Sequence, residues 1–187
     1  MSGAVEHGTG RQCGTCSLCC KLLGIEELDK PQGQWCPHCD PPHGCMIYSR
    51  RPGECRAFNC AWLENAALGD EWKPTRSKMV LYFIDEGARL VAHVDPGTPD
   101  AWRRRPWHDQ LRAWALRGIR NGPNVVVQIE DRVIAVLPDR DVDLGRLEKG
   151  DAGHIGEVQT PAGRRYVARK VPARDIAAPP SETDPAL

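Results

Sequence analysis

The sequence lacks the features that direct a protein to a membrane or to nucleic acid. No apolar run approaches the roughly 18 residues that a membrane span needs. The 25 Lys and Arg residues are balanced by 25 Asp and Glu residues, so no net charge attracts a polyanion. Aromatic residues make up only 6% of the chain. We therefore expect neither a membrane partner nor a nucleic-acid partner.

Several enzyme signatures are also missing. The chain has no glycine-rich nucleotide-binding loop, no G-x-S-x-G turn and no metalloprotease motif. The segment from Met1 to Arg11 is polar and lacks the apolar core of a secretory signal. On this basis we expect a cytoplasmic protein whose thiols stay reduced.

What the sequence does have is a dense group of cysteines. All nine lie between Cys13 and Cys60. Disulfides are disfavoured because the number is odd, Cys19 and Cys20 are adjacent, and the expected compartment is reducing. Residues 13–63 show little hydrophobic periodicity, as expected where metal takes the place of an apolar core. The segment is therefore predicted to bind metal.

The first cysteines follow the spacing of an iron–sulfur protein. Cys13, Cys16 and Cys19 form two consecutive C-x2-C steps, which match the first three ligands of a bacterial ferredoxin. The fourth ligand of such a run would be either the adjacent Cys20 or the Pro-followed Cys36. Zinc also selects thiolates, so the spacing favours a [4Fe–4S] cluster and leaves zinc as an alternative or additional metal.

The number of thiols points to more than one site. Eight or nine thiolates exceed what one metal ion or one cubane cluster uses. We expect two four-thiolate sites, or one cluster and one zinc, with the adjacent Cys19 and Cys20 serving different metals or different iron atoms. Cys39 is the candidate for the spare thiol, and His38 is a possible zinc ligand in place of a cysteine.

An ordered series of motifs makes this segment similar to a known family. The C-x2-C-x2-C-C opening is followed by Trp35-Cys36-Pro37-His38, Gly44-Cys45-Met46-Ile47-Tyr48, Arg51-Pro52, Cys55-Arg56-Ala57-Phe58-Asn59-Cys60 and Trp62-Leu63. Over residues 13–63 the chain resembles the YkgJ-like cysteine cluster family, a domain described as zinc- or iron-chelating. The motifs of the downstream region are weaker.

The resemblance implies a set of eight metal ligands. They are Cys13, Cys16, Cys19, Cys20, Cys36, Cys45, Cys55 and Cys60. Cys39 departs from the eight-cysteine pattern. A similar cluster occurs in flagellin lysine N-methylases, where it is associated with a [4Fe–4S] centre and with methyl transfer from S-adenosylmethionine. The chain looks too short for everything those enzymes hold, so the methylase remains a secondary hypothesis.

Residues between the cysteines are candidates to support the metal. Tyr48, Arg51 and Arg56 carry donors that can hydrogen-bond sulfur and balance the charge of the thiolates. We expect a shield against water from three aromatic residues, Trp35, Phe58 and Trp62.

The predicted organisation has four regions and an α+β fold. We expect a mobile tail over residues 1–12, the cysteine-cluster module over 13–63, an α+β domain over 75–171 and a disordered, Pro-rich tail over 172–187. The metal-organised module is predicted to pack on a small antiparallel sheet or partial barrel with one long helix.

The pattern of the α+β region predicts six strands and one helix. The strand-like runs are 78–85, 88–95, 124–129, 132–138, 154–160 and 164–171, paired around Glu86-Gly87, Glu130-Asp131 and Pro161-Ala162-Gly163. The helix is predicted to be capped by Thr98, kinked or restarted at Pro106 and ended by Gly122-Pro123. Its apolar face is expected to comprise Trp107, Leu111, Trp114, Ala115 and Ile119.

Other polar motifs in this region have ordinary interpretations. Arg103-Arg104-Arg105 is interpreted as a solvated basic run beside buried Trp residues. The sequence pairs His93/Asp95 and His108/Asp109 are interpreted as ordinary polar residues and not as catalytic pairs.

Three hypotheses about function follow. In the first, the cysteines hold an iron–sulfur cluster, with or without zinc, for redox chemistry, sensing or metal handling. In the second, the cluster serves an S-adenosylmethionine-dependent transferase that modifies a protein or peptide. In the third, two zinc ions replace a core, and the module serves interaction with a partner.

Overall fold

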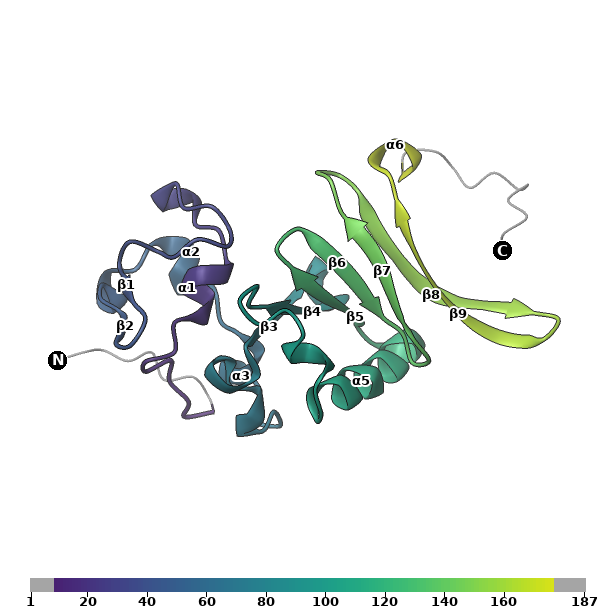
Figure 1. The fold of residues 1–187 in the computed structure, drawn as a ribbon, viewed down its shortest axis with the longest axis horizontal. Coiled ribbons are helices and arrows are strands. Elements are labelled where there is room, and N and C mark those ends of the chain that lie inside the picture. Colours follow the sequence, from purple (N-terminus) through teal and green to yellow (C-terminus); the bar gives the residue numbers. More distant parts are fainter. Residues whose placement is uncertain (1–8, 177–187) are drawn as a thin grey trace.

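The computed structural model describes residues 9–176, and the elements of its cysteine-rich part are all short (Figure 1). They are the helices α1 (Leu18–Leu22), α2 (Gly53–Ala57) and α3 (Ala61–Glu64), the 3-10 turns η1 (Glu26–Leu28) and η2 (Tyr48–Arg50), and the strands β1 (Cys39–Asp40) and β2 (Gly44–Cys45). No helix in this part exceeds five residues. Elements this short need tertiary contacts to persist.

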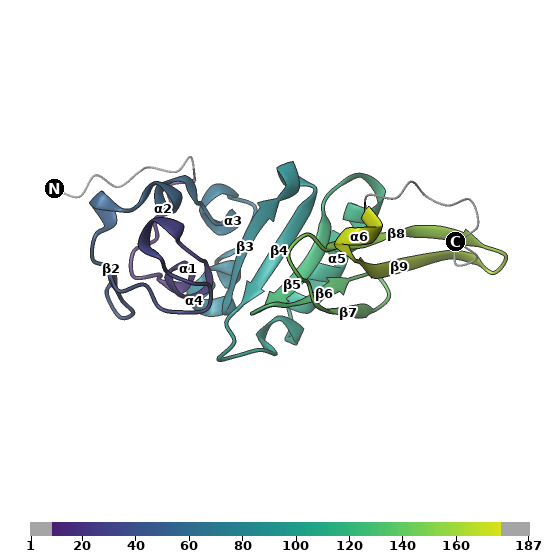
Figure 2. The same cartoon turned by 90° about the horizontal axis from the view of Figure 1, so that it is seen from above.

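The rest of the described chain is a regular α+β structure. Its helices and turns are η3 (Asp70–Trp72), α4 (Pro74–Ser77), η4 (Asp85–Gly87), η5 (Ala101–Arg103), α5 (Trp107–Asn121) and α6 (Ala173–Ile176). Its strands are β3 (Met79–Ile84), β4 (Arg89–Val94), β5 (Asn124–Ile129), β6 (Arg132–Val136), β7 (Asp141–Arg146), β8 (Ala152–Thr160) and β9 (Gly163–Val171). Figure 2 shows the cysteine-rich part at one end of the molecule and the β8–β9 hairpin at the other.

The central sheet is mixed and open. Its strand order is β3-β4-β5-β6-β7, and every neighbouring pair is antiparallel except β4 and β5. Antiparallel neighbours are joined by tight turns, whereas β4 and β5 are joined through α5, and a crossover of this length permits parallel pairing. The expected antiparallel sheet was wrong for this pair, and the described residues form no barrel.

Two strand predictions need a further correction. The strand β7 was not predicted, although Asp141–Arg146 has the polar and apolar alternation of an edge strand. The last hairpin was predicted, but β8 and β9 pair only with each other, as a separate two-stranded sheet.

The long helix starts later than its first capping signal. Thr98 and Pro99 precede only the short turn η5, and α5 begins at Trp107, directly after Pro106. Leu111 and Ala115 are buried, as the predicted apolar face requires, and Gly122 follows the last helical residue. Pro106 therefore restarts the helix, as predicted.

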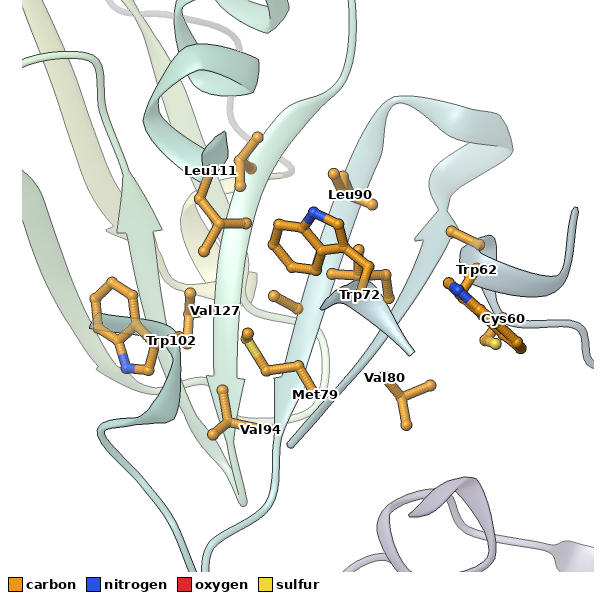
Figure 3. Close-up of a cluster of buried hydrophobic side chains, with 14 of the residues drawn as sticks. Cys60, Trp62, Trp72, Met79, Val80, Leu90, Val94, Trp102, Leu111 and Val127 are labelled. Atoms are coloured by element: carbon orange, nitrogen blue, oxygen red, sulfur yellow. The ribbon is translucent and has the colours of Figure 1, made fainter. Parts of the chain in front are cut away.

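One hydrophobic core joins the cysteine-rich part to the sheet. Leu18 and Leu22 of α1 belong to the same buried cluster as Val80 of β3. Figure 3 shows Cys60 and Trp62 in this cluster near Val80. The regions 13–63 and 75–171 thus share a core, because the short helices of the first region bury their apolar residues on the second.

Parts of both expected tails belong to the described structure. Thr9 donates a 2.6 Å hydrogen bond to the Leu63 carbonyl, and the Arg11 guanidinium donates to the Trp62 and Asn65 carbonyls. The last residues of the expected 1–12 tail are therefore anchored to α3. In the expected 172–187 tail, α6 covers Ala173–Ile176, and the remainder of both tails lies outside the described residues.

Candidate metal centre

The cysteines lie on separate short segments that meet in one region of the fold. The turn at the start is closed by a 2.9 Å hydrogen bond from the Cys16 amide to the Cys13 carbonyl. Helix α1 then carries Cys19 and Cys20 on adjacent positions. Strand β2 carries Cys45, helix α2 carries Cys55, and Cys60 precedes α3.

Eight of these thiols line a single cavity of about 610 Å³. They are Cys13, Cys16, Cys19, Cys20, Cys36, Cys45, Cys55 and Cys60, the eight that the family resemblance implies. Cys39 and His38 do not line it. The structure therefore gathers the predicted ligands and leaves out the two residues whose role was open.

The gathered thiols do not form a finished coordination shell. All nine cysteines are free thiols, and within residues 9–176 no group of three or more His, Cys, Asp or Glu side chains is arranged to hold a metal ion. The fit to a metal rests on the donor chemistry, because eight soft thiols around one cavity suit zinc or an iron–sulfur cluster.

Burial raises the pKa of several cysteines in this part of the chain. It raises the pKa of Cys55 and of Cys60 to about 11 each, and that of Cys39 to about 12. A hydrogen bond with Cys19 is the first cause that raises the pKa of Cys20. Because metals bind the thiolate, occupation of this cavity would release protons, and affinity would fall in acid.

Two of the three predicted supporting residues line the cavity. Tyr48 hydrogen-bonds the Cys13 thiol, and Arg51 stacks on the Tyr48 ring at 3.8 Å from its centroid. The Arg51 charge lowers the pKa of Cys13 against the larger opposing effect of burial. Arg56 does not line the cavity, although it lies on α2 beside Cys55.

Two of the three aromatic residues predicted to shield the metal line the cavity. Trp62 is buried, and Phe58 packs edge-on against Tyr82 with 5.7 Å between ring centroids. Trp35 is 43% exposed and does not line the cavity. The prediction for Trp35 was therefore wrong: its neighbour Cys36 is buried, but the Trp35 ring lies outside, near the Lys21 ammonium.

Sequence reasoning missed a buried cation beside the cysteines. Lys30 is 6% exposed, and its ammonium donates to the carbonyls of Lys21, Leu23 and Pro31. Burial lowers the pKa of Lys30, while nearby Cys36 and other thiols oppose that shift. A buried lysine is rare, and the only sequence signal was its position between the cysteine motifs.

Lys30 has two physical roles here. Its ammonium satisfies carbonyl groups at the C-terminal end of α1, where cations are favoured. It also places a positive charge beside Cys20, Cys36 and Cys55, where thiolates would need one.

The other polar motifs find partners elsewhere. His108 pairs with Asp141 at 3.0 Å, and Asp109 pairs with Arg105. His93 is 1% exposed, whereas Asp95 pairs with Lys21. Neither His–Asp neighbour in the sequence is a pair in space, in agreement with their interpretation as ordinary polar residues.

Comparisons with known proteins find no relative. No family model matches the chain, and neither the curated proteins nor the solved structures contain a match to it. The resemblance to the YkgJ-like family therefore rests on the motif residues. Among the described residues, no helix combines the length and apolar character needed to cross a bilayer.

Proposed function

We propose that residues 13–60 form a thiolate metal centre in a cytoplasmic protein of YkgJ-like type, holding a [4Fe–4S] cluster, zinc or both. The proposal rests on the observation that eight cysteines from separate segments line one cavity and that all of them are free thiols. Such a centre serves redox chemistry, sensing or metal handling. An iron–sulfur cluster bound there would supply one-electron redox chemistry.

The chain's own residues prepare this cavity for negatively charged ligands. Arg51 and Lys30 place positive charge beside the thiols, and Tyr48 offers a hydrogen bond to Cys13. The buried Trp62 and the neighbouring Phe58 keep water from the inner wall. Neighbours of this kind orient ligands and tune a metal centre.

The deciding experiment is metal and acid-labile sulfide analysis with a visible spectrum on anaerobically purified full-length protein. Iron with sulfide supports the redox, sensing or metal-handling role. About two zinc ions per chain and no sulfide would instead make the centre structural, as in an interaction module with a protein or peptide partner. Protein without any thiol-bound metal, even after reconstitution with iron and sulfide or with zinc, would refute the proposal.

A transferase that uses S-adenosylmethionine is the second candidate. The cavity continues past the cysteines to Tyr82, Phe83 and Ile84 at the end of β3, and its volume of about 610 Å³ suits a small organic ligand. Calorimetric titration of S-adenosylmethionine into the metal-loaded protein tests this. A saturable heat of binding supports the transferase hypothesis, and absence of any heat of binding rejects it.

A further inference from the structure

The eight cavity cysteines fall into two groups, of which the first packs against the core of the sheet. Cys60 belongs to the buried hydrophobic cluster, and Cys13 and Cys19 pack against that cluster. The Arg11 guanidinium donates a 2.7 Å hydrogen bond to the Trp62 carbonyl, which joins the segment before Cys13 to the helix that follows Cys60. Cys16 is also tied to Cys13 by the hydrogen bond that closes their turn.

The second group lies around the hairpin and α2. The Cys36 amide donates a 3.0 Å hydrogen bond to the Cys20 carbonyl, which brings these two chain segments together. The Cys39 amide bonds to the Cys36 carbonyl, and Cys39 pairs in register with Cys45, so the hairpin follows directly from Cys36. Helix α2, which carries Cys55, is joined to η1 just after α1 by two hydrogen bonds, from the Glu26 amide to the Glu54 carboxylate and from the Glu54 amide to the Glu27 carboxylate.

Cys19 and Cys20 stand at the boundary between the groups. Their side chains are hydrogen-bonded to each other, yet they leave α1 in different directions because successive helical residues are about 100° apart. Cys19 packs against the core cluster, whereas the Cys20 carbonyl accepts from Cys36. Cys19 therefore belongs to the first group and Cys20 to the second.

Cys39 neighbours the second group without facing the cavity. Its thiol is hydrogen-bonded with Ser17 and Cys20, and it does not line the cavity that holds the other eight. Cys20, Cys36, Cys45 and Cys55 all line the cavity, which makes a complete set of four without Cys39.

We propose that the cavity holds two separate thiophilic metal sites of four cysteines each, with Cys39 a ligand of neither. The core-side site comprises Cys13, Cys16, Cys19 and Cys60. The hairpin-side site comprises Cys20, Cys36, Cys45 and Cys55. This division rests on the proposed function, and it assigns each thiol to a site, which spacing alone leaves open.

Lys30 gives the two sites different charge environments. Its ammonium is bonded to backbone carbonyls, and its charge interacts with Cys36, Cys20 and Cys55 more than with Cys19, so it belongs mainly to the hairpin-side site. Arg51 affects Cys13 as well as Cys45 and Cys55, so it is shared between the sites. The Lys73 charge acts on Cys16 of the core-side site, so the two sites have different lysines near them.

Cadmium-113 NMR of the full-length chain, reduced and loaded with Cd²⁺ alone, tests the division. Two resonances typical of four-thiolate sites are expected. Cys55→Ser should shift or remove one of them, Cys60→Ser should do so to the other, and Cys39→Ser should change neither. Cys45→Ser and Cys16→Ser repeat the test if either first variant fails to fold by circular dichroism.

The possible outcomes distinguish failure of the two-site division from failure of the proposed metal centre. If Cys55→Ser and Cys60→Ser change the same resonance, or if Cys39→Ser removes one, the division is overturned although metal binds. A single resonance in the wild-type chain also overturns it. If Cd²⁺ does not bind the chain at all, the proposed function fails first.

Discussion

The Lys21 ammonium lies 2.6 Å from the Asp95 carboxylate, and both side chains are about one-fifth exposed. Lys21 follows Cys20 on α1, and Asp95 follows the last residue of β4. The same carboxylate accepts a 3.0 Å hydrogen bond from the Gly97 amide. The pair thus joins the helix that carries two cavity cysteines to the end of a central strand.

We expect Lys21→Met and Asp95→Asn to be coupled in folding stability. Burial opposes ionisation of Asp95, but Lys21 and the Gly97 amide outweigh it, so its pKa is lowered. A partly buried pair of this kind should couple by about 1 kcal/mol near neutral pH. A double-mutant cycle of urea unfolding measures the coupling.

Because the pKa of Asp95 is lower in the folded state, the coupling should persist above the ordinary aspartate pKa and disappear as pH falls through the folded value. The Arg89–Asp85 pair is the control and should couple by less, because it is 3.4 Å apart and the Asp85 side chain is 53% exposed. Equal coupling in the two pairs would contradict the prediction.

His93 should make the fold sensitive to mild acid. Burial, with a smaller effect of the Lys30 charge, lowers the pKa of His93 to about 4 from its ordinary 6.5. Between these values the unfolded chain binds a proton that the folded chain does not, so stability falls as pH falls. The total loss is roughly 3 kcal/mol.

The variant His93→Gln should flatten this part of the pH–stability curve, measured by urea unfolding at several pH values. The Tyr82 hydroxyl lies 3.4 Å from His93 Nδ1 and donates a 3.5 Å hydrogen bond to Gln128 Oε1, and the neutral residues Tyr82 and Gln128 stay in place in the variant. His154→Gln, at an exposed position of β8, should keep the wild-type slope. An unchanged slope in His93→Gln would show that another group causes the acid sensitivity.

Arg51 and Arg56 should differ in their effect on metal affinity. Arg51 lines the cavity and stacks on Tyr48, whereas Arg56 does not line it. We expect Arg51→Gln to weaken zinc binding by about 10- to 100-fold, the usual cost of losing a neighbour of the ligands. Competition with a chromophoric zinc chelator measures the affinity.

Arg56→Gln is the control for Arg51→Gln, because it removes the same charge from the same part of the chain. It should bind zinc within a few-fold of the wild type. Equal losses in both variants would mean that net charge, and not contact with the cavity, sets the affinity.

Gly118→Ala should destabilise the fold although alanine is the better helix former. A Cβ atom at Gly118 would overlap the Pro123 carbonyl oxygen and lie 2.9 Å from the carbonyl carbon. Backbone cannot move aside cheaply, so we expect a loss of about 2 kcal/mol in thermal or urea unfolding. At Gly122 the nearest atom is 3.5 Å away. Gly122→Ala should therefore cost less, and the reverse order would refute the steric argument.

Local patterns were sufficient for most of the regular structure. The alternating runs that became β3, β4, β5 and β6 were predicted, since β-branched residues between turn signals specify strands without further context. The helix boundary at Pro106 was also readable, because proline restricts its own backbone. The parallel pairing of β4 with β5 depended on how α5 packs across the sheet.

The sequence by itself determined that all nine cysteines lie between Cys13 and Cys60, and the family resemblance implied the eight that line the cavity. Spacing shows which cysteines are near in the sequence, but it does not show which thiols meet in the fold. Only the tertiary structure decided that Cys39 and Trp35 lie outside the cavity, that Lys30 is buried beside it, and that one core joins the cysteines to the sheet. Those facts depend on contacts between distant segments, which no local pattern encodes.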